Sequence, residues 1–197
     1  MKPHVINDKL LGVAGWYTDK NLSDRLIDLF EKNIDNTHQG MLGEMEIDKN
    51  KKDSIDLDFI LYMKKYPEFN EYLDTLRLSM EEYKKLYPMC SNDHGIWGVT
   101  ENFNMQKYNP GGGFKLWHAE RQGGGPSLLR HLVFMTYLND VTDQGETEWL
   151  YQNLKIKPEK GLTVIWSADW YFTHRGIPSP TQTKYIVTGW YSYLSSE

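Results

Sequence analysis

Apolar side chains recur at helical spacing in two stretches of the N-terminal half. In the first stretch they are Leu22, Leu26, Leu29 and Phe30. In the second they are Phe69, Tyr72, Leu73, Leu76, Met80 and Tyr83. Asn21 or Ser23 could cap the first helix, because short polar side chains accept the free amide hydrogens of a helix start. We expect the second helix to follow Pro67 and to end near Pro88, with its apolar stripe in the core.

Other segments of the chain have patterns that predict β-strands. Over residues 54–60 the apolar and polar positions alternate, which predicts a half-buried strand with Asp56 and Asp58 on the side away from the core. Further strands are predicted at 96–108, 129–138, 152–156, 162–167 and 184–193. The strand 129–138 is apolar on both faces, so we expect it between two layers. Regular short strands separated by Gly and Pro favour a β-sandwich or roll.

Composition narrows the class of protein. A chain of 197 residues is expected to form one domain, which we divide into a mixed helical support region (1–94) and a β-rich core (95–197). The formal net charge of -5 argues against nucleic acid or an anionic membrane as the partner. Cys90 is the single cysteine, so no intrachain disulfide can form. Without an apolar N-terminal segment or membrane span, we expect a soluble, intracellular, cytoplasmic protein.

His118 and Glu120 are the first candidate metal ligands. Residues i and i+2 of a strand point to the same face, so this pair could share one metal. His174, far downstream, could complete the set from another strand. Two histidines and one carboxylate on one side of a metal are typical of non-haem Fe(II) oxygenases. The remaining histidines have no partner at metal spacing or fit a packed strand; they are His4, His38, His94 and His131.

Lys184 is the candidate for binding an anion. It shares a strand face with Ile186 and Trp190, where a buried ammonium is costly without an anionic partner. A 2-oxo acid that chelates iron through two atoms would carry such a partner in its distal carboxylate. Arg175 is a rival, but it directly follows His174, so its side chain should point elsewhere.

Several motifs follow one another in a fixed order in the C-terminal half. They are Tyr108-Asn109-Pro110-Gly111-Gly112-Gly113, His118-Ala119-Glu120, Arg130 opening a strand that ends Tyr137-Leu138-Asn139, Gly145-Glu146-Thr147, His174, and Thr183-Lys184-Tyr185-Ile186-Val187-Thr188-Gly189-Trp190-Tyr191. In this order the chain resembles the 2-oxoglutarate- and Fe(II)-dependent dioxygenases of the prolyl 4-hydroxylase type.

The resemblance implies a fold, cofactors and residue roles. The fold would be α+β and mainly β, a double-stranded β-helix (jelly roll) with supporting N-terminal helices. Fe(II), 2-oxoglutarate and O2 would be needed, with ascorbate as a candidate reductant. The implied iron ligands are His118, Glu120 and His174. The implied co-substrate and pocket residues are Lys184 and Tyr137 at the distal carboxylate, Tyr108 near the metal, and Trp190 near the substrate.

The implied activity is hydroxylation of an unactivated C–H bond. Peptidyl proline is our first choice of substrate, because the closing strand and the Tyr-Leu-Asn strand most resemble prolyl hydroxylases. A free amino acid or another small molecule is the alternative, and a non-catalytic binding module or a site for a different divalent metal is the rival class. The oligomeric state is not predicted.

The chain departs from the family pattern at several positions. Glu120 replaces the usual Asp, and the turn between Tyr108 and His118 is one residue longer than usual. Gln144 stands where a Gly is expected, and Val133 where a Thr is common. The loops near Asn50 and at 123–125 are either lids over the substrate or simple connectors.

Overall fold

The computed structural model describes residues 1–6, 11–43, 46–59, 65–91 and 95–194. The helices are α1 (Lys20–Lys32) and α2 (Pro67–Leu86). The strands are β1 (Lys2–Pro3), β2 (Ala14–Tyr17), β3 (His38–Gln39), β4 (Ile55–Asp58), β5 (Trp97–Gly98), β6 (Asn104–Tyr108), β7 (Arg130–Tyr137), β8 (Thr147–Trp149), β9 (Leu154–Ile156), β10 (Leu162–Ser167), β11 (His174–Gly176) and β12 (Lys184–Tyr193).

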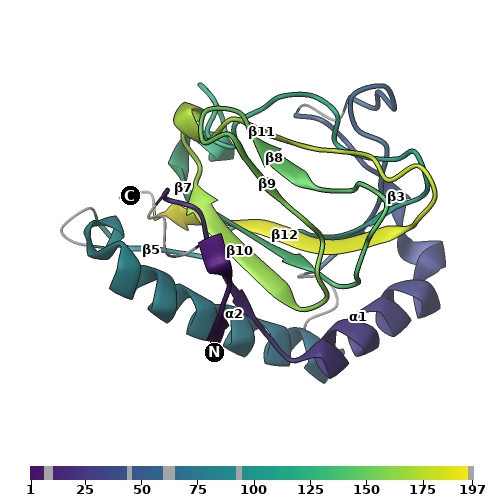
Figure 1. The fold of residues 1–197 in the computed structure, drawn as a ribbon, viewed down its shortest axis with the longest axis horizontal. Coiled ribbons are helices and arrows are strands. Elements are labelled where there is room, and N and C mark those ends of the chain that lie inside the picture. The colour runs from purple at the N-terminus through teal and green to yellow at the C-terminus, as the bar shows by residue number, and fades with distance from the viewer. Residues whose placement is uncertain (7–10, 44–45, 60–64, 92–94, 195–197) are drawn as a thin grey trace.

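Two antiparallel sheets enclose the interior of the molecule. Within the described ranges the main sheet has the order β1-β2-β10-β7-β12-β6-β4-β3, with β5 also paired to β12, and the minor sheet has the order β11-β8-β9. In Figure 1 both helices lie along one side of the main sheet, and the minor sheet lies on the other side. The predicted fold class, a mainly β jelly roll backed by N-terminal helices, is confirmed.

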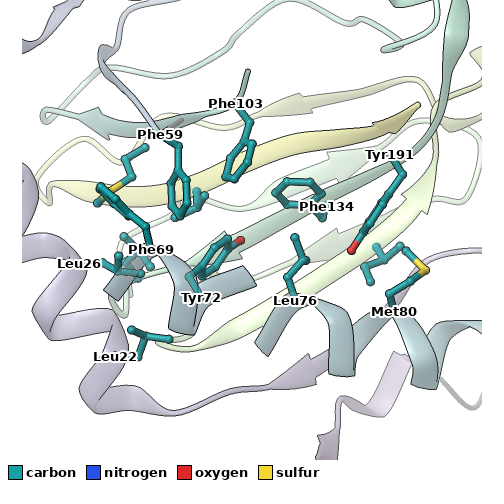
Figure 2. Packing of buried hydrophobic residues seen from close by; sticks show 14 of the residues in the cluster. Leu22, Leu26, Phe59, Phe69, Tyr72, Leu76, Met80, Phe103, Phe134 and Tyr191 are labelled. Atoms are coloured by element: carbon teal, nitrogen blue, oxygen red, sulfur yellow. The ribbon is translucent and has the colours of Figure 1, made fainter. Parts of the chain in front are cut away.

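The helices follow their predicted apolar stripes. α1 buries Leu22, Leu26, Leu29 and Phe30, and α2 buries Phe69, Tyr72, Leu76, Met80 and Tyr83. Figure 2 shows the helix side chains facing Phe59, Phe103 and Phe134 on the sheet side; those labelled are Leu22, Leu26, Phe69, Tyr72, Leu76 and Met80. The capping prediction was wrong: Asp19, not Asn21 or Ser23, accepts the Asn21 amide hydrogen at 2.9 Å.

β7 lies between two cores, as its two apolar faces predicted. Leu132, Phe134 and Leu138 belong to the cluster beneath the helices, whereas Val133, Met135 and Tyr137 belong to the cluster between the two sheets. Each fully buried apolar side chain of this kind contributes about 1.5–3 kcal/mol. The second cluster forms the wall against which the candidate site is built.

Several local predictions need correction. The predicted strand 96–108 is two strands, β5 and β6, separated by a non-strand segment. Asp56 was expected away from the core, but it is 1% exposed. Its carboxylate accepts hydrogen bonds from Lys52 Nζ at 2.9 Å and Ser54 Oγ at 2.7 Å. Residue 60 of the predicted strand 54–60 and His94 lie outside the described residues.

The N-terminal part of the chain adds strands as well as helices to the fold. β2 pairs with β10, and β4 pairs with β6, so the main sheet contains strands from both sides of residue 94. The division into 1–94 and 95–197 stays a prediction. Neither helix of the described chain has the length and apolar character needed to cross a bilayer.

Candidate metal centre

Backbone pairing brings His118 and His174 together. The amide of His118 donates to the carbonyl of His174 at 3.0 Å, and the reverse bond measures 2.9 Å. His174 is the first residue of β11, but the segment that contains His118 and Glu120 is extended chain outside any strand. The spacing of His118 and Glu120 suggested a strand end; in the structure an isolated β-bridge pairs His118 with His174 instead.

The three candidate ligands converge on one point. The Oε1 atom of Glu120 lies 3.4 Å from His118 Nε2 and 3.5 Å from His174 Nε2. One ligand atom from each residue fits within 4.8 Å of the others, and no second such cluster occurs among the described residues.

Backbone carbonyls set the tautomer of both imidazoles. Nδ1 of His118 lies 2.9 Å from the carbonyl of Leu116, and Nδ1 of His174 lies 2.9 Å from that of Phe172. A carbonyl can only accept, so each Nδ1 carries the proton. In the neutral imidazole, each Nε2 then presents a lone pair to the point where the ligands meet.

The charge of the cluster suits a divalent cation. Burial would raise the pKa of the Glu120 carboxyl, but hydrogen bonds and charge from His118 and His174 outweigh it and hold this pKa well below the ordinary value. Burial and the neighbouring His118 lower the pKa of His174, which favours the neutral imidazole. A carboxylate beside two imidazoles is the donor set that Fe(II) takes.

Aromatic rings fix the two histidines. Phe114 stacks on His118 with ring centroids 3.8 Å apart and an interplanar angle of 13°. Trp149 and Trp166 pack beside His174 at 6.2 and 5.1 Å between ring centroids. Both indole nitrogens are buried and have no hydrogen-bond partner among the residues that the structure describes. Buried polar atoms are rarely left unpaired, so these donors are suited to a polar ligand in the interior of the roll.

Lys184 enters the same interior from the start of β12. It is 4% exposed, and its Nζ donates to the carbonyl of Gly145 at 2.9 Å. Within the described part of the chain, no carboxylate lies within 4.0 Å of this ammonium. Burial lowers the pKa of Lys184 to about 8, while the charge of Glu146 acts in the opposite direction. This cation and the two indole donors fit an anionic ligand such as 2-oxoglutarate.

Two tyrosines of the predicted site are engaged with protein partners. Tyr137 donates to Thr147 Oγ1 at 2.7 Å. Tyr108 donates to Gln106 Oε1 at 2.6 Å, and the Gln106 amide donates to Asp56 at 3.2 Å. Burial, then the charges of Asp56 and Glu120, raise the pKa of Tyr108. Both tyrosines therefore stay protonated, and either must leave its partner before it can donate to a co-substrate.

Trp190, predicted to lie near the substrate, contacts one of the candidate metal ligands directly. Its Nε1 donates to Glu120 Oε2 at 2.9 Å. Sequence reasoning identified Arg130 only as the residue that opens a strand, and did not single out Glu101. Both belong to the site, because Arg130 contacts Glu120 and is itself paired with Glu101. A strand-opening arginine in the motif was the only available signal.

Comparisons with known proteins agree with a metal centre of this kind. Residues 103–192 match the family described as the 2OG-Fe(II) oxygenase superfamily. No curated protein is significantly similar in sequence. A prolyl-4-hydroxylase from Pseudomonas putida is similar in structure, with a TM-score of 0.72, 14% identity, and coverage of 96% of this chain and 98% of that one.

Two further solved structures resemble the fold. The viral collagen prolyl hydroxylase of Paramecium Bursaria Chlorella virus-1, in complex with 2OG, has a TM-score of 0.67 and 18% identity, covering 93% of this chain and 97% of its own. A Trichoplax adhaerens prolyl hydroxylase, in complex with a hypoxia inducible factor peptide fragment, has a TM-score of 0.72 and 18% identity, with coverage of 95% and 87%. At these identities the likeness concerns the fold.

Proposed function

We propose that this chain, which matches the 2OG-Fe(II) oxygenase superfamily over residues 103–192, hydroxylates proline residues in a peptide or protein. The enzyme is a dioxygenase, and its cofactors are Fe(II) and 2-oxoglutarate. The coarse reaction class rests on the family match. The choice of substrate is the part that needs a direct test.

The similar folds support peptidyl proline. The three similar structures described above are prolyl hydroxylases, and one was determined with a peptide fragment bound. Low sequence identity leaves the substrate open, since one fold can serve many substrates. A free amino acid or another small molecule is the outcome that would replace a peptide.

We assign the metal to His118, Glu120 and His174. The bound metal and 2-oxoglutarate supply the oxidation of the substrate C–H bond. The imidazoles bind through Nε2, because their Nδ1 protons are held by backbone carbonyls. Glu120 supplies the negative charge that keeps a divalent cation in place.

Lys184 binds the distal carboxylate of 2-oxoglutarate in this proposal. Its ammonium is buried, and an incoming carboxylate would compensate the cost of that burial. Trp149 and Trp166 bring indole donors and apolar ring surface to the same interior. Both rings also pack beside His174, at 6.2 and 5.1 Å between ring centroids.

One observation carries the proposal: two imidazoles, one carboxylate and a buried ammonium face one interior, and no described carboxylate pairs with that ammonium. The test is incubation of the Fe(II)-loaded protein with 2-oxoglutarate, O2 and a set of proline-containing peptides. Mass spectrometry should find the mass gain of one oxygen atom on proline, and succinate should form in step with it. His174→Ala is the matched inactive control.

Free proline and other free amino acids run alongside the peptides. Hydroxylation of a free amino acid with all peptides unchanged would reject peptidyl proline while keeping the oxygenase. Peptide oxidation that persists in His174→Ala would reject the assigned metal site.

A further inference from the structure

The two oxygen atoms of Glu120 have different surroundings. Oε1 faces the Nε2 atoms of His118 and His174 at 3.4 and 3.5 Å. Oε2 faces away from them and accepts from Trp190 Nε1 at 2.9 Å and from Arg130 Nη1 at 3.3 Å. One oxygen is therefore directed at the metal position, and the other is held by two donors.

Arg130 is itself fixed from several sides. Its Nη2 lies 2.8 Å from Glu101 Oε2, and its Nε lies 3.1 Å from Glu101 Oε1. Ser192 Oγ donates to Glu101 Oε1 at 2.7 Å. The guanidinium carbon lies 3.5 Å from the centroid of the Trp190 ring. A planar guanidinium can pair with a carboxylate through two nitrogens and stack on a ring, which a lysine ammonium cannot do. These contacts together hold the Arg130 guanidinium in one orientation.

The network is also shielded from solvent. The side chains of Arg130, Glu101 and Glu120 are 17%, 18% and 14% exposed. Hydrogen bonds to charged groups contribute about 1.5–3 kcal/mol each. Rotating the carboxylate so that both oxygens face the metal would break two such bonds at once.

A chelating carboxylate would occupy an extra position on the metal. A facial site of two imidazoles and one carboxylate oxygen leaves three positions, which 2-oxoglutarate and O2 need. We propose that Arg130 and Trp190 are positioning residues that restrict Glu120 to binding through Oε1 alone and so keep the O2 position open. This inference rests on the proposed iron site, and it gives the longer Glu side chain a role: it reaches the metal position and both donors together.

The test uses nitric oxide as an O2 analogue on the protein loaded anaerobically with Fe(II) and 2-oxoglutarate. Electron paramagnetic resonance of the iron–nitrosyl complex reports whether the O2 position is open, independently of turnover. The variants are Trp190→Phe, which keeps a ring and removes the donor, and Arg130→Met combined with Glu101→Gln, which removes the guanidinium together with the charge of its partner Glu101. Arg25→Met is the matched control, since that guanidinium pairs with Glu71 on the helix surface at 2.7 Å.

We expect both site variants to lower the affinity for nitric oxide about tenfold or more while iron binding stays within about tenfold of wild type. Arg25→Met should leave both unchanged. Thermal unfolding verifies that each variant is folded. Wild-type nitric oxide affinity in the site variants would overturn the inference.

Loss of iron together with the nitrosyl signal would also overturn it, because the pair would then hold the ligand rather than set its binding mode. Failure of the wild-type protein to bind Fe(II) would instead reject the proposed function, and this inference with it. The two failures are therefore distinguishable in one experiment.

Discussion

Raising the pH from 7 to 9 should weaken 2-oxoglutarate binding by discharging Lys184. The pKa of this buried ammonium is about 8 in the absence of a co-substrate. Only the protonated form offers a charge to the distal carboxylate. If that form alone binds, the apparent dissociation constant rises about tenfold between pH 7 and pH 9.

The same group predicts an opposite trend for stability. Burial lowers the folded-state pKa of Lys184 from 10.5 to about 8, so the folded protein disfavours the charged form. The free-energy cost of burying the charged Lys184 is present in full below pH 8, and it disappears as the pH rises through 8 toward 10.5. At about 1.4 kcal/mol per pH unit, it amounts to about 3 kcal/mol. Lys184→Met should therefore stabilise the co-substrate-free protein at pH 7 while it weakens 2-oxoglutarate binding.

Anaerobic titration calorimetry with Mn(II) in place of iron measures the binding trend, and buffers of different ionisation enthalpy report the protons taken up. We expect close to one proton per 2-oxoglutarate near pH 9. Lys184→Arg is the control, since guanidinium stays charged and its binding should not depend on pH in this range. An affinity that stays constant from pH 7 to 9 with no proton uptake would refute the role of Lys184.

Three other changes test neighbouring features. Glu120→Asp should lower metal affinity about tenfold, because the shorter side chain cannot reach the imidazoles and its two donors together; competition with a fluorescent chelator measures it, and unchanged affinity would contradict the geometry. Lys52→Met should lower the free energy of unfolding, measured with urea, by about 3–5 kcal/mol, because the buried Asp56 charge loses its ammonium partner. Replacing both residues, as Lys52→Met/Asp56→Leu, should recover most of that stability. An equal loss in the single and the double variant would show that the ion pair is not the cause. Gly189→Ala should lower the free energy of unfolding by about 1–3 kcal/mol, because the added methyl group would lie 2.5 Å from Phe103 Cβ. A Tm equal to that of wild type would show that the neighbouring side chains can move to accommodate the methyl group.

Periodicity was enough to predict the two helices and the long strands. β10 and β12 have the predicted bounds, and β7 has the predicted apolar faces. Buried positions of a strand require apolar side chains, so these strands can be recognised in the sequence. Two- and three-residue strands such as β1, β3 and β8 were not predicted. Their pairing depends on distant chain segments, which leave no pattern in so few residues.

The charged residues were harder to predict than the apolar ones. Asp56 was expected away from the core because it alternates with apolar neighbours, yet Lys52 and Gln106 pair with it in the interior. The convergence of Glu120 with Arg130 and Trp190 joins three separate segments. Sequence spacing can suggest that such residues share a site, but it cannot say which oxygen of Glu120 each donor contacts.

The central claim is that His118, Glu120 and His174 bind Fe(II) together with 2-oxoglutarate. Anaerobic addition of both to the protein tests it most directly, through the weak visible charge-transfer absorption of iron chelated by a 2-oxo acid. The absorption should saturate at one iron per chain, disappear in His174→Ala, and need more 2-oxoglutarate in Lys184→Met. Folded wild-type protein that develops no such absorption, or His174→Ala protein that retains it, would contradict the assigned metal site.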